Sequence, residues 1–211
     1  MRILTGLLVL TLSMGAMAQL APGHYQAGRH YEVLEKPVAT SDPDKIEVVE
    51  IFSYLCGHCF TFAPLVSAWE ERLADDVVLV HAHAVWAPAM EAYARGWHTA
   101  KALGIFEEVH MPIFTSVHQE RKQMNDAEAW ADFLASYGAD RDDALKAYNS
   151  MGVSNQVRQN ANRIREDYKS RGTPELVVDG KYRISARGAG THSEMLRIAD
   201  YLIEQIRAER K

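Results

Sequence analysis

The seven residues Ile46–Phe52 (IEVVEIF) constrain the fold more than any other part of this 211-residue chain. The run is rich in β-branched residues and follows a turn-forming cluster, Ser41-Asp42-Pro43-Asp44. A continuous apolar run of this length is typical of a strand that is buried on both faces, and such strands belong to parallel sheets covered by helices. The sequence therefore predicts an α/β fold.

A helix and a second strand are expected directly after this run. Residues 57–73 carry apolar side chains at spacings of three and four, which indicates a helix with one buried face. Residues 77–85 (VVLVHAHAV) are a second strand candidate. Strand, helix and strand in succession make a βαβ unit, so the two strands are expected to be parallel and joined by a right-handed crossover.

The β pattern then stops, and helical periodicity runs over residues 88–171. Within this block we expect helix N-caps at Asn125, Asp140 and Ser154, a helix end at Gly138 and a break between helices at Gly152.

The β pattern returns near the C-terminus. Residues 174–178 and 182–185 flank Asp179-Gly180-Lys181, which is a hairpin signature. Residues 193–207 then form an amphipathic helix, whose inward side chains are Met195, Leu196, Ala199, Leu202 and Ile206. This order predicts a helical domain, residues 87–171, inserted into a βαβ…ββα domain made of residues 19–86 and 172–211.

The N-terminus has the pattern of a secretory signal peptide, residues 1–18. Met1-Arg2 is a short basic start, residues 3–12 are largely apolar, and Ala16-Met17-Ala18 has the small residues of a cleavage site. The apolar stretch is too short to cross a bilayer, although an uncleaved anchor is the alternative. Export would bring the protein into an oxidising compartment. The formal net charge of −5 and the lack of Lys/Arg blocks argue against a nucleic-acid partner.

The chain contains only two cysteines, Cys56 and Cys59, at the point where the first strand gives way to the first helix. As a structural disulfide they would close a very short loop, which stabilises a protein by only about 2 kcal/mol. A zinc site would need two more ligands, and His81 and His83 are available. They are alternate residues of one strand and so point to the same face, and no second cysteine pair exists. We therefore favour a redox-reactive pair, with no cofactor and no metal.

The predicted helix places the two sulfur atoms in different environments. Cys56 at the helix start can accept hydrogen bonds from unpaired first-turn N–H groups at the positive end of the helix dipole, which lowers a thiol pKa. Cys59 lies one turn deeper on the same face and is more covered. This makes Cys56 the attacking and leaving sulfur and Cys59 the resolving thiol. His58 either favours the ionised sulfur of Cys56 or is simply a solvent-facing side chain.

Two further positions are unusual for their elements. Glu50 places a carboxylate inside a doubly buried strand, which is costly unless the group is paired or protonated. It is either a proton acceptor for Cys59 or a structurally paired acid. Thr173-Pro174 opens a strand that is expected to be internal, where proline is rare. A cis bond there would turn the Thr173 backbone toward an incoming partner.

These features together resemble the DsbA family of periplasmic thiol:disulfide oxidoreductases, which have a thioredoxin-like fold. The resemblance rests on Cys-Gly-His-Cys at residues 56–59, the EIFS sequence before it, the helical insertion and GTPELVVDGKY at residues 172–182. It implies that Pro174 is cis, that Glu50 is buried below Cys59 and that Cys56 forms the mixed disulfide. Two positions depart from the family pattern: Gly57-His58 replaces the more usual Pro-His, and His81 stands where some members carry a lysine.

The resemblance also implies the reaction and the partners. The expected enzyme donates its Cys56–Cys59 disulfide to unfolded or reduced exported proteins, is a monomer in the periplasm, and is reoxidised by an inner-membrane protein of the DsbB type. A periplasmic isomerase or reductase shares this chemistry, but usually adds a dimerisation domain, for which the residues before the first strand are too few. A non-catalytic peptide-binding module would not need Cys56 at all.

Overall fold

The structure is a computed structural model that describes residues 25–210, so the predicted signal peptide lies outside the described residues. The strands are β1 (Glu32–Val33), β2 (Ile46–Phe52), β3 (Val77–His83), β4 (Glu175–Val178) and β5 (Tyr182–Ser185). The helices are α1 (Gly57–Glu70), α2 (Pro88–Ala102), α3 (Phe106–His118), α4 (Ala127–Ala135), α5 (Arg141–Tyr148), α6 (Met151–Asn162), the π-helical turn η1 (Arg163–Asp167), α7 (Ala186–Ala189) and α8 (His192–Glu209).

Within residues 25–210 the strands form one five-stranded sheet in the order β1-β5-β4-β2-β3. β2 pairs with β3 in parallel along its whole length, and every residue of β2 is buried. The predictions of a doubly buried strand and of a parallel βαβ unit are therefore confirmed. β4 pairs antiparallel with both β2 and β5, which confirms the predicted C-terminal hairpin. The chain has an α/β, thioredoxin-like fold.

The hairpin turn requires glycine at its second position. Asp179 and Gly180 both have positive φ angles, 53° and 59°. The backbone N–H of Val38 donates to the Gly180 carbonyl at 2.9 Å. A Cβ atom on Gly180 would lie 1.9 Å from the Val38 carbonyl oxygen, so a larger residue would push the N-terminal segment away from the hairpin.

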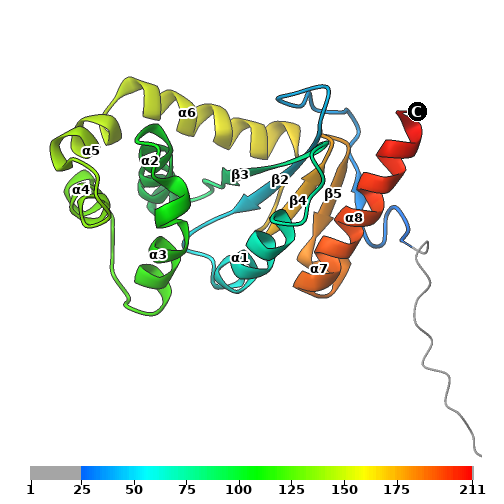
Figure 1. Cartoon of the computed structure of the whole chain (residues 1–211), viewed down its shortest axis with the longest axis horizontal. Helices are drawn as coiled ribbons and strands as arrows, with labels where there is room; N and C mark the ends of the chain where they lie inside the picture. The colour runs from blue at the N-terminus through cyan, green and yellow to red at the C-terminus, as the bar shows by residue number, and fades with distance from the viewer. Residues whose placement is uncertain (1–24, 211) are drawn as a thin grey trace, which may run out of the picture.

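Helices cover both faces of the sheet (Figure 1). Alternate residues of β2 point to opposite faces. Ile46 and Val48 pack in one core with α1 and α8, whereas Val49 and Ile51 pack in another with Ile164 of η1. Figure 1 shows α6, in yellow, running across the side opposite to α1. Glu50 shares the parity of Ile46 and Val48, so its side chain faces α1.

The helices between β3 and β4 supply most of a third core. Its largest fully buried side chains include Trp97, Trp130 and Phe114. The same core contains Phe52 from the end of β2 and Cys59 from α1. The helical layer therefore packs directly against the segment that carries the cysteines.

Three local predictions within the helical block are wrong. The N-cap of α4 is Asp126 and not Asn125, because the Asp126 carboxylate accepts a hydrogen bond from the backbone N–H of Ala129. The N-cap of α6 is Ser150, whose hydroxyl accepts from the N–H of Val153. Ser154 lies inside α6 and donates back to the Ser150 carbonyl, so Gly152 does not break the helix.

The other caps agree with the sequence. The Asp140 side chain caps α5 by accepting from the N–H of Asp143, and Gly138 follows α4 with a φ of 94°. All five inward residues predicted for the last helix are buried in α8.

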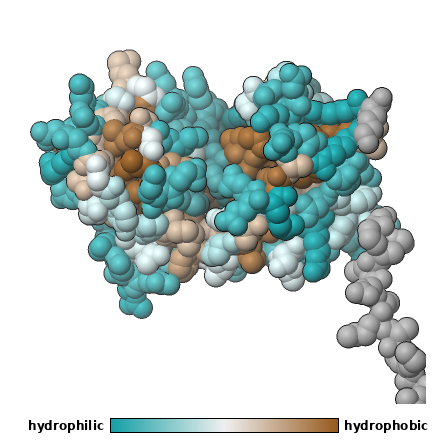
Figure 2. Space-filling model, in the orientation of Figure 1, coloured by the Kyte–Doolittle hydropathy of each residue, from teal (hydrophilic) through white to brown (hydrophobic). Residues whose placement is uncertain are grey.

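The surface view shows a largely hydrophilic face with a few apolar patches (Figure 2). No helix within residues 25–210 is both long enough and apolar enough to cross a membrane.

Candidate active site

A tight turn after β2 folds α1 back over the sheet. The N–H of Cys56 donates to the Ser53 carbonyl at 3.0 Å, and the Ser53 hydroxyl accepts from the N–H of Leu55 at 3.2 Å. Cys56 is the N-cap of α1, with extended backbone and no side-chain capping bond. Its sulfur therefore lies at the open end of the helix, where the first-turn N–H groups have no other partner.

The surroundings of Cys56 stabilise its thiolate. The pKa of Cys56 is lowered to about 5; a hydrogen bond from the Cys59 thiol is the largest cause, and partial burial opposes the shift. Hydrogen bonds from the Thr173 side chain and from the backbone N–H groups of Cys59 and His58 contribute to the same lowering. Cys56 is partly exposed, so the thiolate is accessible to another sulfur.

Cys59 has the opposite properties. Its side chain is completely buried, and burial raises its pKa far above that of a free thiol. Its hydrogen bond to Cys56 and the negative charge of Cys56 raise the pKa further, and Glu50 adds a smaller effect in the same direction. The asymmetry that the sequence predicted between the two cysteines is present in the structure.

The segment before β4 lies beside Cys56, although the two are 117 residues apart in the chain. The Thr173–Pro174 peptide bond is cis, and the Thr173 carbonyl oxygen lies 3.4 Å from the Cys56 sulfur. The carbonyl accepts a hydrogen bond from the thiol form, whereas the Thr173 side chain favours the thiolate. Because Pro174 precedes the first paired residue of β4, Glu175, its missing N–H removes no hydrogen bond from the sheet.

Glu50 lies on the α1 side of β2 and is only 1% exposed. Its carboxylate is 2.7 Å from Nδ1 of His81, the neighbouring residue on β3. Burial alone would lower the pKa of His81, but the hydrogen bond and charge of Glu50, together with Glu70 and Glu107, outweigh burial and raise it. The buried acid is thus paired with an imidazole and also acts electrostatically on Cys59.

Comparison with known proteins identifies the family of this chain. A family model described as a DSBA-like thioredoxin domain matches residues 84–195. The thiol:disulfide interchange protein DsbA of Pseudomonas aeruginosa is 38% identical over 209 residues, which cover 99% of this chain and 98% of that protein. This chain belongs to the DsbA family. The DsbA of Azotobacter vinelandii is 38% identical over 197 residues, covering 93% of this chain and 92% of that protein.

Solved DsbA structures share the whole fold. The crystal structure of Pseudomonas aeruginosa DsbA matches with a TM-score of 0.84 at 38% identity, covering 88% of this chain and 96% of that chain. DsbA from Xylella fastidiosa matches with a TM-score of 0.82 at 29% identity, covering 87% and 98%. As a DsbA-family protein, the chain is a thiol:disulfide oxidoreductase that acts on protein substrates.

His58 and an unpredicted second histidine lie at the rim of this DsbA-family site. His58 is exposed in the first turn of α1, and its ring centre is 6.1 Å from that of His192, the first residue of α8. Burial and the charge of His58 lower the pKa of His192, while the Cys56 thiolate opposes this shift. Sequence reasoning missed His192 because nothing local places the start of α8 beside α1.

A group of histidines also holds the turn of this DsbA-family chain from behind, again without a signal in the sequence. Nε2 of His83 accepts from the N–H of Tyr54, Nε2 of His118 donates to the Tyr54 carbonyl, and the Tyr54 hydroxyl is 2.9 Å from Nδ1 of His110. Burial lowers the pKa of both His83 and His110 to about 3, so both rings are neutral. These bonds fix the residue that leads from β2 into the Cys56 turn.

Proposed function

We propose that this protein is an oxidant that donates its Cys56–Cys59 disulfide to newly exported proteins. A substrate thiolate attacks the Cys56 sulfur, the disulfide breaks, and Cys59 leaves and takes up a proton. A second substrate thiolate then attacks the substrate sulfur of the mixed disulfide, and Cys56 leaves as a thiolate. The substrate loses two electrons and gains a disulfide, and the enzyme becomes the dithiol.

The observation that carries this proposal is the difference between the two thiols. Cys56 is partly exposed with a pKa of about 5, and Cys59 is buried with a raised pKa. A stable Cys56 thiolate favours the dithiol over the disulfide, which makes the disulfide oxidising. It also makes Cys56 the better leaving group, which speeds release of the oxidised substrate.

The neighbouring residues receive supporting roles in this proposal. The Glu50–His81 pair exchanges the proton that Cys59 takes up or releases. Thr173 and Pro174 present a backbone edge to the substrate chain beside Cys56, and His58 stabilises the Cys56 thiolate. The pairing at 2.7 Å and the 3.4 Å contact support the first two roles.

The cellular setting follows from the N-terminal pattern and the family. We infer that residues 1–18 are removed as a signal peptide and that the monomer acts in the periplasm. The substrates are unfolded or reduced exported proteins, and a DsbB-type inner-membrane protein restores the disulfide.

We also propose that residues 87–171 are a helical domain inserted between residues 19–86 and 172–211. Most residues of one hydrophobic core come from α2–α5, which supports this division.

The redox equilibrium of the Cys56–Cys59 pair with glutathione tests the direction of transfer. An oxidant requires an equilibrium constant close to that of the strongly oxidising members of the thioredoxin-like proteins, whereas a reductase lies near thioredoxin itself. Because Gly57-His58 replaces the family's more usual Pro-His, an isomerase is the second candidate. An equilibrium constant between those of an oxidant and a reductase would favour an isomerase.

Trapping experiments test the residue roles. A Cys59→Ser variant should accumulate a mixed disulfide at Cys56 with a reduced, unfolded substrate after activation with a small disulfide. A Cys56→Ser variant should form none under the same conditions. Equal trapping by both variants would contradict the assignment of Cys56 as the attacked sulfur.

A further inference from the structure

A cavity of about 390 Å³ lies between α2 and α6, away from the cysteines. One wall of the cavity is α6, which lies on the side of the sheet opposite to α1 (Figure 1). Its lining residues come from α2, α6 and the start of η1, and are His98, Lys101, Ala102, Gln156, Gln159, Asn160 and Arg163. A volume near 400 Å³ lies within the range of small-molecule sites, which begins at about 300 Å³.

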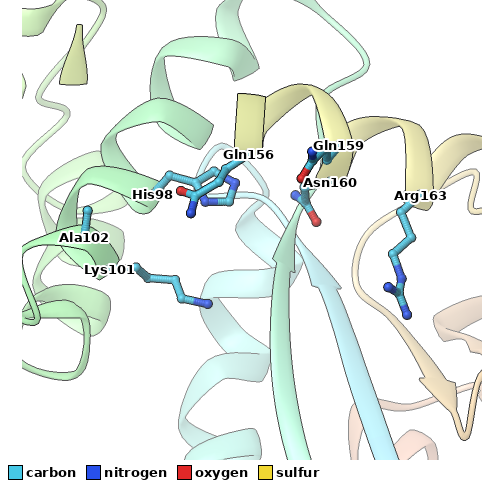
Figure 3. A pocket seen from close by; sticks show the side chains of 7 residues that line it. All are labelled: His98, Lys101, Ala102, Gln156, Gln159, Asn160 and Arg163. Carbon is cyan, nitrogen blue, oxygen red and sulfur yellow. The ribbon is translucent and has the colours of Figure 1, made fainter. Parts of the chain in front are cut away.

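The lining has the composition of an anion site. Lys101 and Arg163 lie toward opposite ends, and the side chains of His98 and the three amide residues lie between them (Figure 3). No carboxylate is among the lining residues. The chain as a whole has a formal net charge of −5, so this cavity is a cationic site on an acidic protein.

Two of the lining groups have polar atoms without a partner. Lys101 makes no ion pair within residues 25–210; its ammonium lies 4.9 Å from the centre of the Trp97 ring. His98 is only 7% exposed, and its Nε2 has no hydrogen-bond partner in the described part of the chain. A buried nitrogen left unpaired costs stability, and a ligand that accepts a hydrogen bond from it would remove that cost. Burial and the charge of Lys101 lower the pKa of His98 to about 4, so this ring is neutral, and its Nε2–H tautomer can donate one hydrogen bond.

The opposite wall is held in place before any ligand binds. Nε of Arg163 donates to the Tyr168 hydroxyl at 2.7 Å, and Nη2 donates to the Ala39 carbonyl at 2.5 Å. Glu47 lies 3.7 Å from the same guanidinium and offsets part of its charge. The side-chain NH2 of Asn160 donates to the His83 carbonyl at 2.7 Å. A ligand would therefore meet ordered groups on this side, which reduces the entropy cost of binding.

We propose that the cavity between α2 and α6 binds a small organic or inorganic anion that carries a carboxylate or phosphate group. Lys101 and the outward edge of Arg163 supply the charge, and the N–H of His98 and the amides of Gln156 and Gln159 supply directed hydrogen bonds. The site is independent of disulfide exchange, because none of its residues contacts either cysteine.

Binding can be measured directly on the full-length mature protein by NMR titration of the backbone and side-chain amide signals. Two probes separate the possible sources: inorganic phosphate for phosphorylated ligands and succinate for carboxylates. At least one should produce saturable shifts in α2 and α6 with a dissociation constant of about 1 mM or lower. No saturable binding of either probe in this range would overturn the proposal.

Matched charge variants decide whether the anion binds in the cavity or is attracted only by the overall charge of the protein. Lys101→Gln should weaken binding about fivefold or more, because it removes the unpaired ammonium. Lys146→Gln removes the same charge from an exposed position on α5, also without an ion pair in residues 25–210, and should change binding less than about twofold. Equal weakening by both variants would mean that only the overall charge attracts the anion, and would overturn the site.

A third variant tests the histidine. His98→Phe keeps a ring against Trp97, whose ring centre lies 4.3 Å from that of His98, but removes the N–H donor. Weaker binding with an unchanged thermal unfolding midpoint would support a direct contact. Unchanged binding in both His98→Phe and Lys101→Gln would contradict the proposal, whatever the redox activity of these proteins.

Discussion

Acidification should abolish the stability advantage of the reduced protein over the oxidised protein. Folding lowers the pKa of Cys56 to about 5, whereas an unfolded thiol titrates near 8.5. A group whose pKa is lower in the folded state contributes stability above its unfolded pKa and loses it as the pH falls through its folded pKa. The contribution of Cys56 is thus complete above about pH 8.5 and is lost below about pH 5. The oxidised protein has no free thiol and therefore lacks this contribution to stability.

The magnitude follows from the same two values. At pH 7 the two pH units above the folded pKa correspond to about 3 kcal/mol. Because Cys56 is partly exposed, solvent screening reduces this contribution, and we expect about 1–2 kcal/mol. The difference in unfolding free energy between the reduced and oxidised forms should grow by that amount from about pH 4.5 to pH 7.

Urea unfolding of both redox forms across this pH range measures the difference, and groups that titrate equally in both forms cancel. Ultraviolet absorbance of the thiolate gives the pKa of Cys56 in the same samples. A Cys56→Ser variant is the control and should show no such pH-dependent gain under reducing conditions. A constant difference between the two forms from about pH 4.5 to pH 8, or a Cys56 pKa near 8.5, would refute the reasoning.

Two further variants test the proton acceptor and the helical layer. Glu50→Gln should slow the attack of Cys59 on a glutathione mixed disulfide at Cys56 about tenfold or more at neutral pH, because a general base is lost. Stopped-flow measurements give this rate. An unchanged rate would mean that the carboxylate has only a structural role. Gly96→Ala should lower the unfolding free energy by about 1–3 kcal/mol, because the new Cβ would lie 2.1 Å from the Trp130 ring. Gly152→Ala, whose Cβ would meet nothing closer than 3.7 Å, is the matched control in urea unfolding and should cost nothing.

The local structure around the cysteines was predictable because it depends on neighbours in the chain. The apolar side chains of Ile46–Phe52 leave water only if both faces of the strand are covered, and the run is a fully buried strand. The spacing of Cys56 and Cys59 in a helix places one sulfur at the end and the other a turn deeper, and their exposures differ accordingly. Caps were less predictable, since Asn125 and Asp126 are both good caps and only the packing of α4 selects between them.

The sequence alone determined the order of strands and helices, the hairpin turn and the position of the cysteine pair at a helix start, because periodicity, turn residues and spacing act over a few residues. Only the tertiary structure decided what surrounds the sulfurs. It brings Thr173 to Cys56 and His192 to His58 from distant segments, and it pairs Glu50 with His81 across neighbouring strands. The pKa of a thiol depends on burial and on charges within a few ångströms, and chain folding alone sets those distances.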